Sequence, residues 1–305
     1  MQIPKKILVI ITREQANQPA LERALRFADN CSIEITLFSA VYEPALELTA
    51  VLAPDERRQF KQQYLEARRS YLLSLIEQHS DDSISIKCQV AWHKKPAHAA
   101  VQYFQNNAFD LVIKKVSSDS NTHNPFVMPG DWHLLRFCPS PLLLVKDNKW
   151  HTKSAILGAI SSTSEDTEHQ QLNHKVIEYT QYLAELTGGE AHVVNSHVSP
   201  TMDAPIELPS IDIKGLREKV SALHMEKTQS IVAAHPFCEH HIHVVEGLAE
   251  EKIPLTAQRV NAQIVVMGTV GRTGLTAAFM GNTAERVLAK LPCEVLALKP
   301  DNFEI

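Results

Sequence analysis

Ile264-Val265-Val266-Met267-Gly268-Thr269-Val270-Gly271 is an apolar run that ends in two glycines, and a third glycine, Gly281, follows ten residues later. Residues 282–290 then have the pattern of a helix. This order predicts a strand, a glycine-hinged loop and a helix N-terminus, which can turn unpaired backbone N–H groups toward an anion such as a phosphate. The spacing Gly-x2-Gly-x9-Gly fits neither the P-loop nor the dinucleotide fingerprint.

The same pattern occurs in the first half of the chain at a constant offset of 153 residues. Asp110-Leu111-Val112-Ile113 overlays Gln263-Ile264-Val265-Val266 without a gap. One unit is therefore duplicated. We predict two domains, residues 1–148 and 152–305, whose short polar connection favours packing of the halves over free swinging.

Short β-branched runs alternate with longer amphipathic ones in each copy. This alternation predicts an α/β fold with two three-layer sandwiches, each with a five-stranded parallel sheet joined by right-handed crossovers. The predicted strands are 6–11, 33–41, 84–91, 110–115 and 141–146, then 154–160, 190–197, 241–246, 263–268 and 294–299. The predicted helices are 18–30, 55–79, 96–107 and 131–137, then 168–187, 213–235, 250–261 and 283–290. Ligands of such sheets bind beyond the carboxyl ends of the strands, where Gly268 lies.

The glycine spacing resembles the nucleotide loop of the universal stress protein family, Gly-x2-Gly-x9-Gly-(Ser/Thr). The surrounding text, Val266-Met267-Gly268-Thr269-Val270-Gly271-Arg272-Thr273-Gly274 through Pro292-Cys293-Glu294-Val295-Leu296, strengthens the match. The asymmetry between the copies resembles that of tandem members of the family, and the resemblance covers essentially the whole chain. It implies two flavodoxin-like, adenine nucleotide alpha hydrolase-like domains packed as an internal pseudo-dimer, with further self-association as an option. It also implies a cytoplasmic stress-response protein that binds a small molecule and is not an enzyme.

The resemblance implies that the second copy holds ATP or another nucleotide, with no other cofactor. The binding residues that it implies are Ser161, Val198, Met267, Gly268, Thr269, Gly271, Arg272, Gly281, Asn282 and Thr283. Two of these depart from the family pattern, because Ser161 stands where ATP binders carry an Asp and Asn282 where they carry a Ser or Thr. Asn282 either caps the helix, with Glu285 completing a capping box, or contacts the ligand. A second function therefore stays open: a nucleotide-independent scaffold or apolar small-molecule binder in which the glycine loop is only an inherited turn.

The first copy has lost the loop. Lys115, Ser118 and Met128 stand at the positions of the three glycines, and Asp131 is predicted to cap the following helix, where its carboxylate would oppose a phosphate. Lys114 and Lys115 either offset that charge or, as we favour, extend along the strand end into solvent. We therefore expect a phosphate-bearing ligand only in the second copy.

Composition limits the classes of function. The chain has 305 residues, 44% of them hydrophobic, and a net charge of −5 without a basic block, which argues against a dedicated nucleic-acid binder. No apolar run approaches the roughly 20 residues of a membrane span, so no membrane partner is expected. Five scattered cysteines without paired spacing indicate reduced thiols in a reducing compartment.

Histidines gather between residues 235 and 243, with Cys238 among them. They offer enough donors for a metal, yet His240 is predicted to point away from His241 and His243 on a strand. The favoured interpretation is a solvated strand entry, and no metal site is predicted. No Ser, His and acid grouping has the context of a nucleophile elbow, so no catalytic residue is predicted either.

Overall fold

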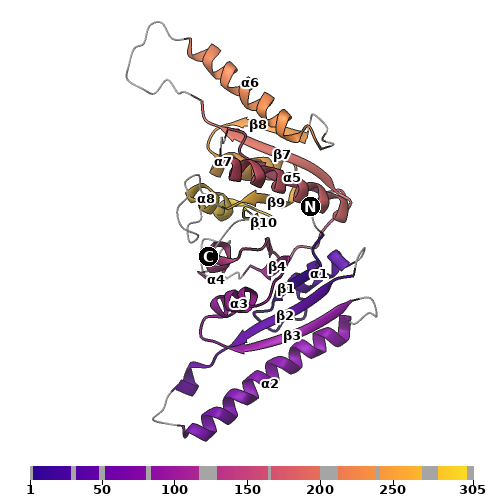
Figure 1. The fold of residues 1–305 in the computed structure, drawn as a ribbon, viewed down its shortest axis with the longest axis vertical. Coiled ribbons are helices and arrows are strands. Elements are labelled where there is room, and N and C mark those ends of the chain that lie inside the picture. Colours follow the sequence, from indigo (N-terminus) through magenta and orange to yellow (C-terminus); the bar gives the residue numbers. More distant parts are fainter. Residues whose placement is uncertain are drawn as a thin grey trace. The chain divides into compact units, whose positions relative to one another are not determined.

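The computed structural model describes residues 3–28, 32–47, 52–79, 84–116, 129–163, 166–199, 212–235, 237, 241–269 and 281–300. The chain divides into two compact units, residues 2–149 and 150–305, which we call the first and the second unit. Each unit is a three-layer α/β sandwich whose helices pack along the strands of its sheet (Figure 1). In the described part of the chain, no helix has both the length and the apolar character needed to cross a membrane.

The first unit has a parallel sheet in the order β3-β2-β1-β4-β5. Its strands are β1 (Lys6–Ile10), β2 (Glu34–Val41), β3 (Ser85–Trp92), β4 (Leu111–Lys115) and β5 (Leu142–Val145). Its helices are α1 (Pro19–Ala28), α2 (Pro54–His79), α3 (Pro96–Gln105) and α4 (Pro129–Phe137), with a short 3-10 turn, η1 (Pro44–Glu47).

The second unit repeats this arrangement, with the parallel order β10-β9-β6-β7-β8. Its strands are β6 (Ala155–Ile160), β7 (Glu190–His197), β8 (Ile242–Glu246), β9 (Ala262–Gly268) and β10 (Glu294–Leu298). Its helices are α5 (Thr167–Thr187), α6 (Ile213–Val232), α7 (Ala249–Arg259) and α8 (Asn282–Lys290).

The predicted α/β class is confirmed, and every predicted strand and helix is present, with ends that differ by at most three residues. The largest difference is the end of α6, which stops at Val232 instead of residue 235. The turn η1 was not predicted. Asp131 does not precede α4 as its cap, because the helix already begins at Pro129, and proline suits the first helical position.

The inner strands carry the core of each unit. Ile7, Leu8 and Val9 of β1 are fully buried, as are residues 264–266 of β9. Parallel strands covered by helices on both faces are buried on both faces, which explains why these runs are continuously apolar instead of alternating. Cys88, Cys138 and Cys293 are not joined in disulfides, whereas Cys31 and Cys238 lie outside the described residues.

Candidate functional site

A cavity of about 670 Å³ opens at the carboxyl ends of the strands of the second unit. Residues that follow β6, β7 and β8 line it, together with the end of β9 and the first turns of α7 and α8. Carboxyl strand ends are the usual ligand position in open parallel sheets, and this volume is in the range of small-molecule sites.

Seven of the ten implied binding residues line this cavity: Ser161, Val198, Met267, Gly268, Gly281, Asn282 and Thr283. Thr269 does not line it, because the residue is buried and both its backbone N–H and its hydroxyl donate to the Leu298 carbonyl, at 3.1 and 3.3 Å. Gly271 and Arg272 lie outside the described residues. The fold therefore gathers residues more than 100 positions apart at one opening.

The two ends of the glycine loop meet at the wall of the cavity. The Gly281 N–H donates to the Thr269 carbonyl at 3.1 Å, so the chain leaves and returns at the same point. Gly281 is the N-cap of α8, with φ −64° and ψ 136°, and no side chain in the described part of the chain caps the helix. Asn282 is thus the first helical residue, and of the two alternatives left open for it, the cap with a Glu285 capping box does not form. The first-turn N–H groups of α8 lie at the cavity wall without a side-chain cap.

Gly268 has a packing role that the sequence did not indicate. A Cβ atom there would meet Leu172 Cδ2 of α5 at 2.5 Å, closer than real Cβ contacts come. Leu172 itself lines the cavity. The missing side chain at Gly268 therefore lets α5 pack closely on the end of β9.

Ser161, the first residue after β6, is held by its backbone. Its N–H donates to Asn173 Oδ1 at 3.1 Å, and its carbonyl accepts from Asn173 Nδ2 at 2.8 Å. Asn173 is a buried residue of α5 that also lines the cavity, and sequence reasoning missed it. Its amide therefore fixes the chain just after the end of β6.

Two histidines, His197 and His224, line another part of the cavity with their rings stacked 4.7 Å apart. His224 Nδ1 lies 3.1 Å from the Ser162 hydroxyl, and the buried Asn195 amide donates to that hydroxyl at 2.5 Å and to Thr228 Oγ1 at 2.9 Å. Burial, and then the charges of His197 and Lys227, lower the pKa of His224. The sequence signal for this cluster was the polar run Asn195-Ser196-His197 at the end of β7.

Glu250, in the first turn of α7, places a carboxylate at the cavity. Its Oε1 accepts from Arg286 Nη1 at 3.1 Å. A backbone hydrogen bond and this Arg286 contact hold the pKa of Glu250 below its usual value. Neither Lys nor Arg occurs among the described residues that line the cavity.

The corresponding helix start in the first unit contains a buried ion pair. Lys114 Nζ lies 2.6 Å from Asp131 Oδ1, and the two side chains are 6% and 1% exposed. The favoured interpretation of Lys114 as a solvent-extended lysine was therefore wrong. Because β4 is covered on both faces, its penultimate side chain points into the unit, where the Asp131 carboxylate neutralises it. Lys115 instead pairs with Asp147 at 2.5 Å.

The histidines near residue 240 separate in the structure. His235 Nδ1 contacts Gln181 Oε1 at 2.8 Å, and Cys238 and His240 lie outside the described residues. His241 and His243 lie beside His192 of the neighbouring strand, with ring centroids 4.0 and 5.3 Å away. Sequence reasoning missed His192 because it lies on a different strand.

Comparisons with known proteins agree with this architecture. The model of the "Universal stress protein family" matches residues 4–146 and 167–299, so the chain belongs to that family. It is homologous over its full length to universal stress protein E of Escherichia coli K12, with 35% identity over 100% of this chain and 96% of the relative. A homolog from Haemophilus influenzae is 33% identical over 97% of both chains.

Solved structures show the same fold. A structure from Pseudomonas aeruginosa UCBPP-PA14 has a TM-score of 0.78 and 29% identity, covering 98% of this chain and 95% of its own. A universal stress protein from Archaeoglobus fulgidus DSM 4304 has a TM-score of 0.61 at 17% identity, covering 96% of this chain and 98% of its own, a likeness of fold alone.

Proposed function

We propose that this universal stress protein is a non-enzymatic stress-response module that binds a nucleotide, with ATP as the first candidate, in the cavity of its second unit. The observation that carries the proposal is the cavity wall formed by Gly268, Gly281 and the start of α8. Helix N-termini favour anions through their N–H groups and dipole, so this wall suits a phosphate. The rest of the cavity has room for a nucleoside.

A second candidate is an apolar or uncharged small molecule in the same cavity. The charges of the described lining favour it, because Glu250 contributes a carboxylate and no described lining residue is a lysine or arginine. A polyphosphate would then rely on the helix terminus and on Arg272, which lies outside the described residues. Nucleotide charge is thus the property that separates the two candidates.

Calorimetric titration of the full chain with ATP and with adenosine tests the proposal. We expect ATP to bind more tightly than adenosine, by the roughly 0.3–2 kcal/mol that a helix terminus contributes to a bound anion. Gly281→Val should abolish the ATP signal. Because Gly281 has a negative φ that valine also adopts, the loss would come from the side chain at the cavity and not from backbone strain.

The matched control is Gly130→Ala at the helix start of the first unit, where a Cβ would meet Ala97 Cβ at an ordinary 3.5 Å. This variant should bind ATP as the wild type does, and so should Met128→Gly, without adding a site. If millimolar ATP gives no signal, or if Gly281→Val binds as well as the wild type, the nucleotide proposal is wrong. If adenosine binds and ATP binds no more tightly, the result would favour the uncharged ligand.

Native mass spectrometry of protein purified without added ligand would give the mass of any co-purified molecule.

The family and the duplication also support an assembly proposal: the two units associate as an internal pseudo-dimer. A single-copy module of this kind has an open sheet whose fifth strand is an edge strand, and a second copy in the same chain is a direct means of covering that edge.

A further inference from the structure

We propose that Glu190, His192 and His241 bind a divalent transition-metal ion, with Zn²⁺ as the first choice. Among the described residues they form a group of three whose ligand atoms all lie within 4.8 Å of one another. The group is independent of the proposed nucleotide cavity. It lies at the amino ends of β7 and β8, whereas the cavity lies at the carboxyl ends of the same strands.

The strands bring these three residues together. β7 and β8 are parallel neighbours with Val193 paired to Ile242, so His192 and His241, each one residue earlier, are adjacent. Glu190 is two residues before His192 and therefore lies on the same face of β7. The Glu190 N–H donates to the Ser154 carbonyl at 3.2 Å, which ties this end of β7 to the chain at β6. Strand backbone thus holds two of the three ligands, and a rigid frame suits a metal site.

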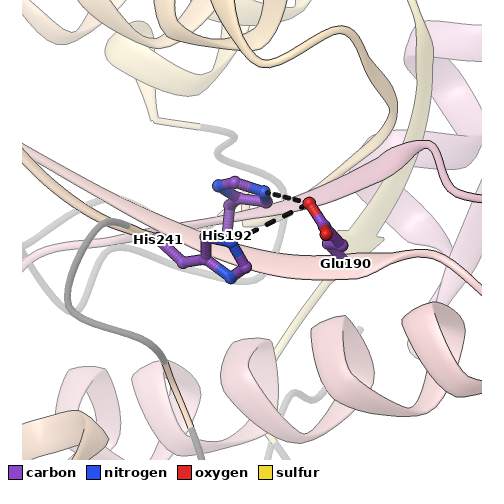
Figure 2. Close-up of side chains that lie close together, drawn as sticks. All are labelled: Glu190, His192 and His241. Carbon is purple, nitrogen blue, oxygen red and sulfur yellow. Dashed lines mark ion pairs between the residues drawn. The ribbon is translucent and has the colours of Figure 1, made fainter.

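The side chains converge on one oxygen. Glu190 Oε2 lies 3.7 Å from His192 Nε2 and 3.8 Å from His241 Nε2. Figure 2 shows both histidine rings facing the Glu190 carboxylate. Two ligand atoms of a tetrahedral zinc ion, each about 2.0–2.2 Å from the metal, are about 3.3 Å apart. Inward shifts of a few tenths of an ångström would therefore bring the two His–Glu pairs to coordination distance.

The donor chemistry selects the ion. Two imidazoles and one carboxylate suit Zn²⁺ and its neighbours Co²⁺, Ni²⁺ and Cu²⁺, whereas Mg²⁺ and Ca²⁺ prefer all-oxygen sites. The two histidine side chains are 9% and 13% exposed, but the Glu190 side chain is 63% exposed, so an ion can enter from solvent. Three protein ligands leave a fourth position for water.

An ordinary ion pair explains the arrangement less well. Glu190 carries one negative charge, and two protonated histidines with ring centroids 4.0 Å apart would repel each other. A divalent ion, in contrast, uses the lone pairs of two neutral imidazoles and neutralises the carboxylate.

A chain of hydrogen bonds beyond the ligands sets the tautomer of His192. Arg259 Nη2 lies 3.1 Å from His243 Nδ1, and since arginine only donates, His243 keeps its proton on Nε2. His243 Nε2 then donates to His192 Nδ1 at 3.0 Å, which places the proton of neutral His192 on Nε2. Metal binding needs a lone pair at that nitrogen. It therefore reverses the hydrogen bond between the two histidines and releases Arg259, whose side chain is exposed.

The test is a Zn²⁺ titration of the full chain without a histidine tag, after dialysis against a chelator, in competition with a chromogenic chelator. We expect one Zn²⁺ per chain and a higher melting temperature with the ion. Glu190→Gln and His241→Gln should each weaken binding at least about tenfold and remove the thermal shift. With Co²⁺, the wild type should show the intense visible bands of a four-coordinate site, and the two variants should lose them.

His174→Gln is the control, since it removes an exposed histidine of α5 in the same unit. It should leave the Zn²⁺ affinity unchanged. Glu190→Gln alters an exposed side chain and should fold normally, which circular dichroism checks. The proposal is overturned if both ligand variants bind Zn²⁺ as tightly as the wild type, or if His174→Gln weakens binding by the same factor, as scattered surface sites would.

Discussion

At the scale of single residues, the two copies use the same helix start in opposite ways. In the second unit, Gly281 leaves the start of α8 without a side-chain cap at the cavity. In the first unit, Asp131 brings a carboxylate into the first turn of α4, and Lys114 neutralises it. A negative group of the protein itself therefore takes the position that an anion would need, and we expect no phosphate to bind at this point of the first unit.

Asp131→Ala should destabilise the protein, because it leaves the Lys114 ammonium buried without its counter-charge. Breaking such a pair typically costs about 3–5 kcal/mol, whereas replacing both partners by apolar groups is often neutral. Urea unfolding of Asp131→Ala and of the double variant Lys114→Met/Asp131→Leu measures both effects. A loss below about 1 kcal/mol in Asp131→Ala, the scale of an exposed pair, would contradict the role given to this ion pair.

Arg259→Ala should tighten Zn²⁺ binding, because the guanidinium holds His243, and through it His192, in the tautomer that opposes the metal. The competition titration described above measures the change, with Arg286→Ala on α8 as a control that removes a guanidinium from elsewhere in the same unit. Unchanged or weaker affinity in Arg259→Ala would contradict the proposed reversal of the hydrogen bond.

At the scale of elements, α3 and α4 of the first unit meet through histidines. The rings of His98 and His133 stack with centroids 3.6 Å apart. The Phe137 ring packs against His133, with centroids 4.6 Å apart. Burial, together with the charges of His98, Lys95 and Arg136, lowers the pKa of His133 to about 4. This helix contact is therefore made by neutral rings.

The stability of the first unit should consequently depend on pH. The folded pKa of His133 is below its ordinary value of 6.5, so the unfolded chain takes up the proton more readily. The contribution of neutral His133 to the free energy of unfolding is complete above about pH 6.5 and is lost as the pH falls toward 4. Melting temperatures between pH 7 and 4 should fall less steeply for His133→Gln than for the wild type, and His174→Gln should follow the wild type. If the melting temperatures of the wild type and of His133→Gln fall with pH in parallel, His133 is not the source of the pH dependence.

At the scale of the whole molecule, duplication has produced two units with the same strand order and different sites. The second unit has the cavity with the glycine-loop ends and the proposed metal ligands. The first has a filled helix start and a histidine contact. The helix start of the second unit therefore lies at a cavity, whereas that of the first unit carries an internal ion pair.

We predict that residues 1–148 and 152–305, expressed separately, are less stable than the full chain, as the pseudo-dimer proposal requires. Each half should melt at a lower temperature or self-associate, and mixing the halves should restore part of the loss. Calorimetry and size-exclusion chromatography measure both properties. Two soluble monomeric halves that melt near the temperature of the full chain would refute the proposal.

The amino-acid sequence by itself determined the duplication, the order and type of the elements, and the family. These follow from local patterns, because buried parallel strands are continuously apolar and amphipathic helices repeat their apolar residues every three to four positions. The duplication is recognised from the constant offset alone, without knowing which residues are in contact. The glycine pattern likewise predicted a candidate site at the end of β9, and Gly268 and Gly281 line the cavity there.

Only the tertiary structure decided which side chains meet. Glu190 and His241 are 51 residues apart in the chain, and the parallel register of β7 and β8 makes them neighbours. The Asn173 clamp on Ser161 and the burial of Lys114 likewise depend on helices packed from elsewhere in the fold. The physical reason is that the chemistry of a polar group depends on its desolvation and on its partners, and both are properties of the packed molecule that no local pattern contains.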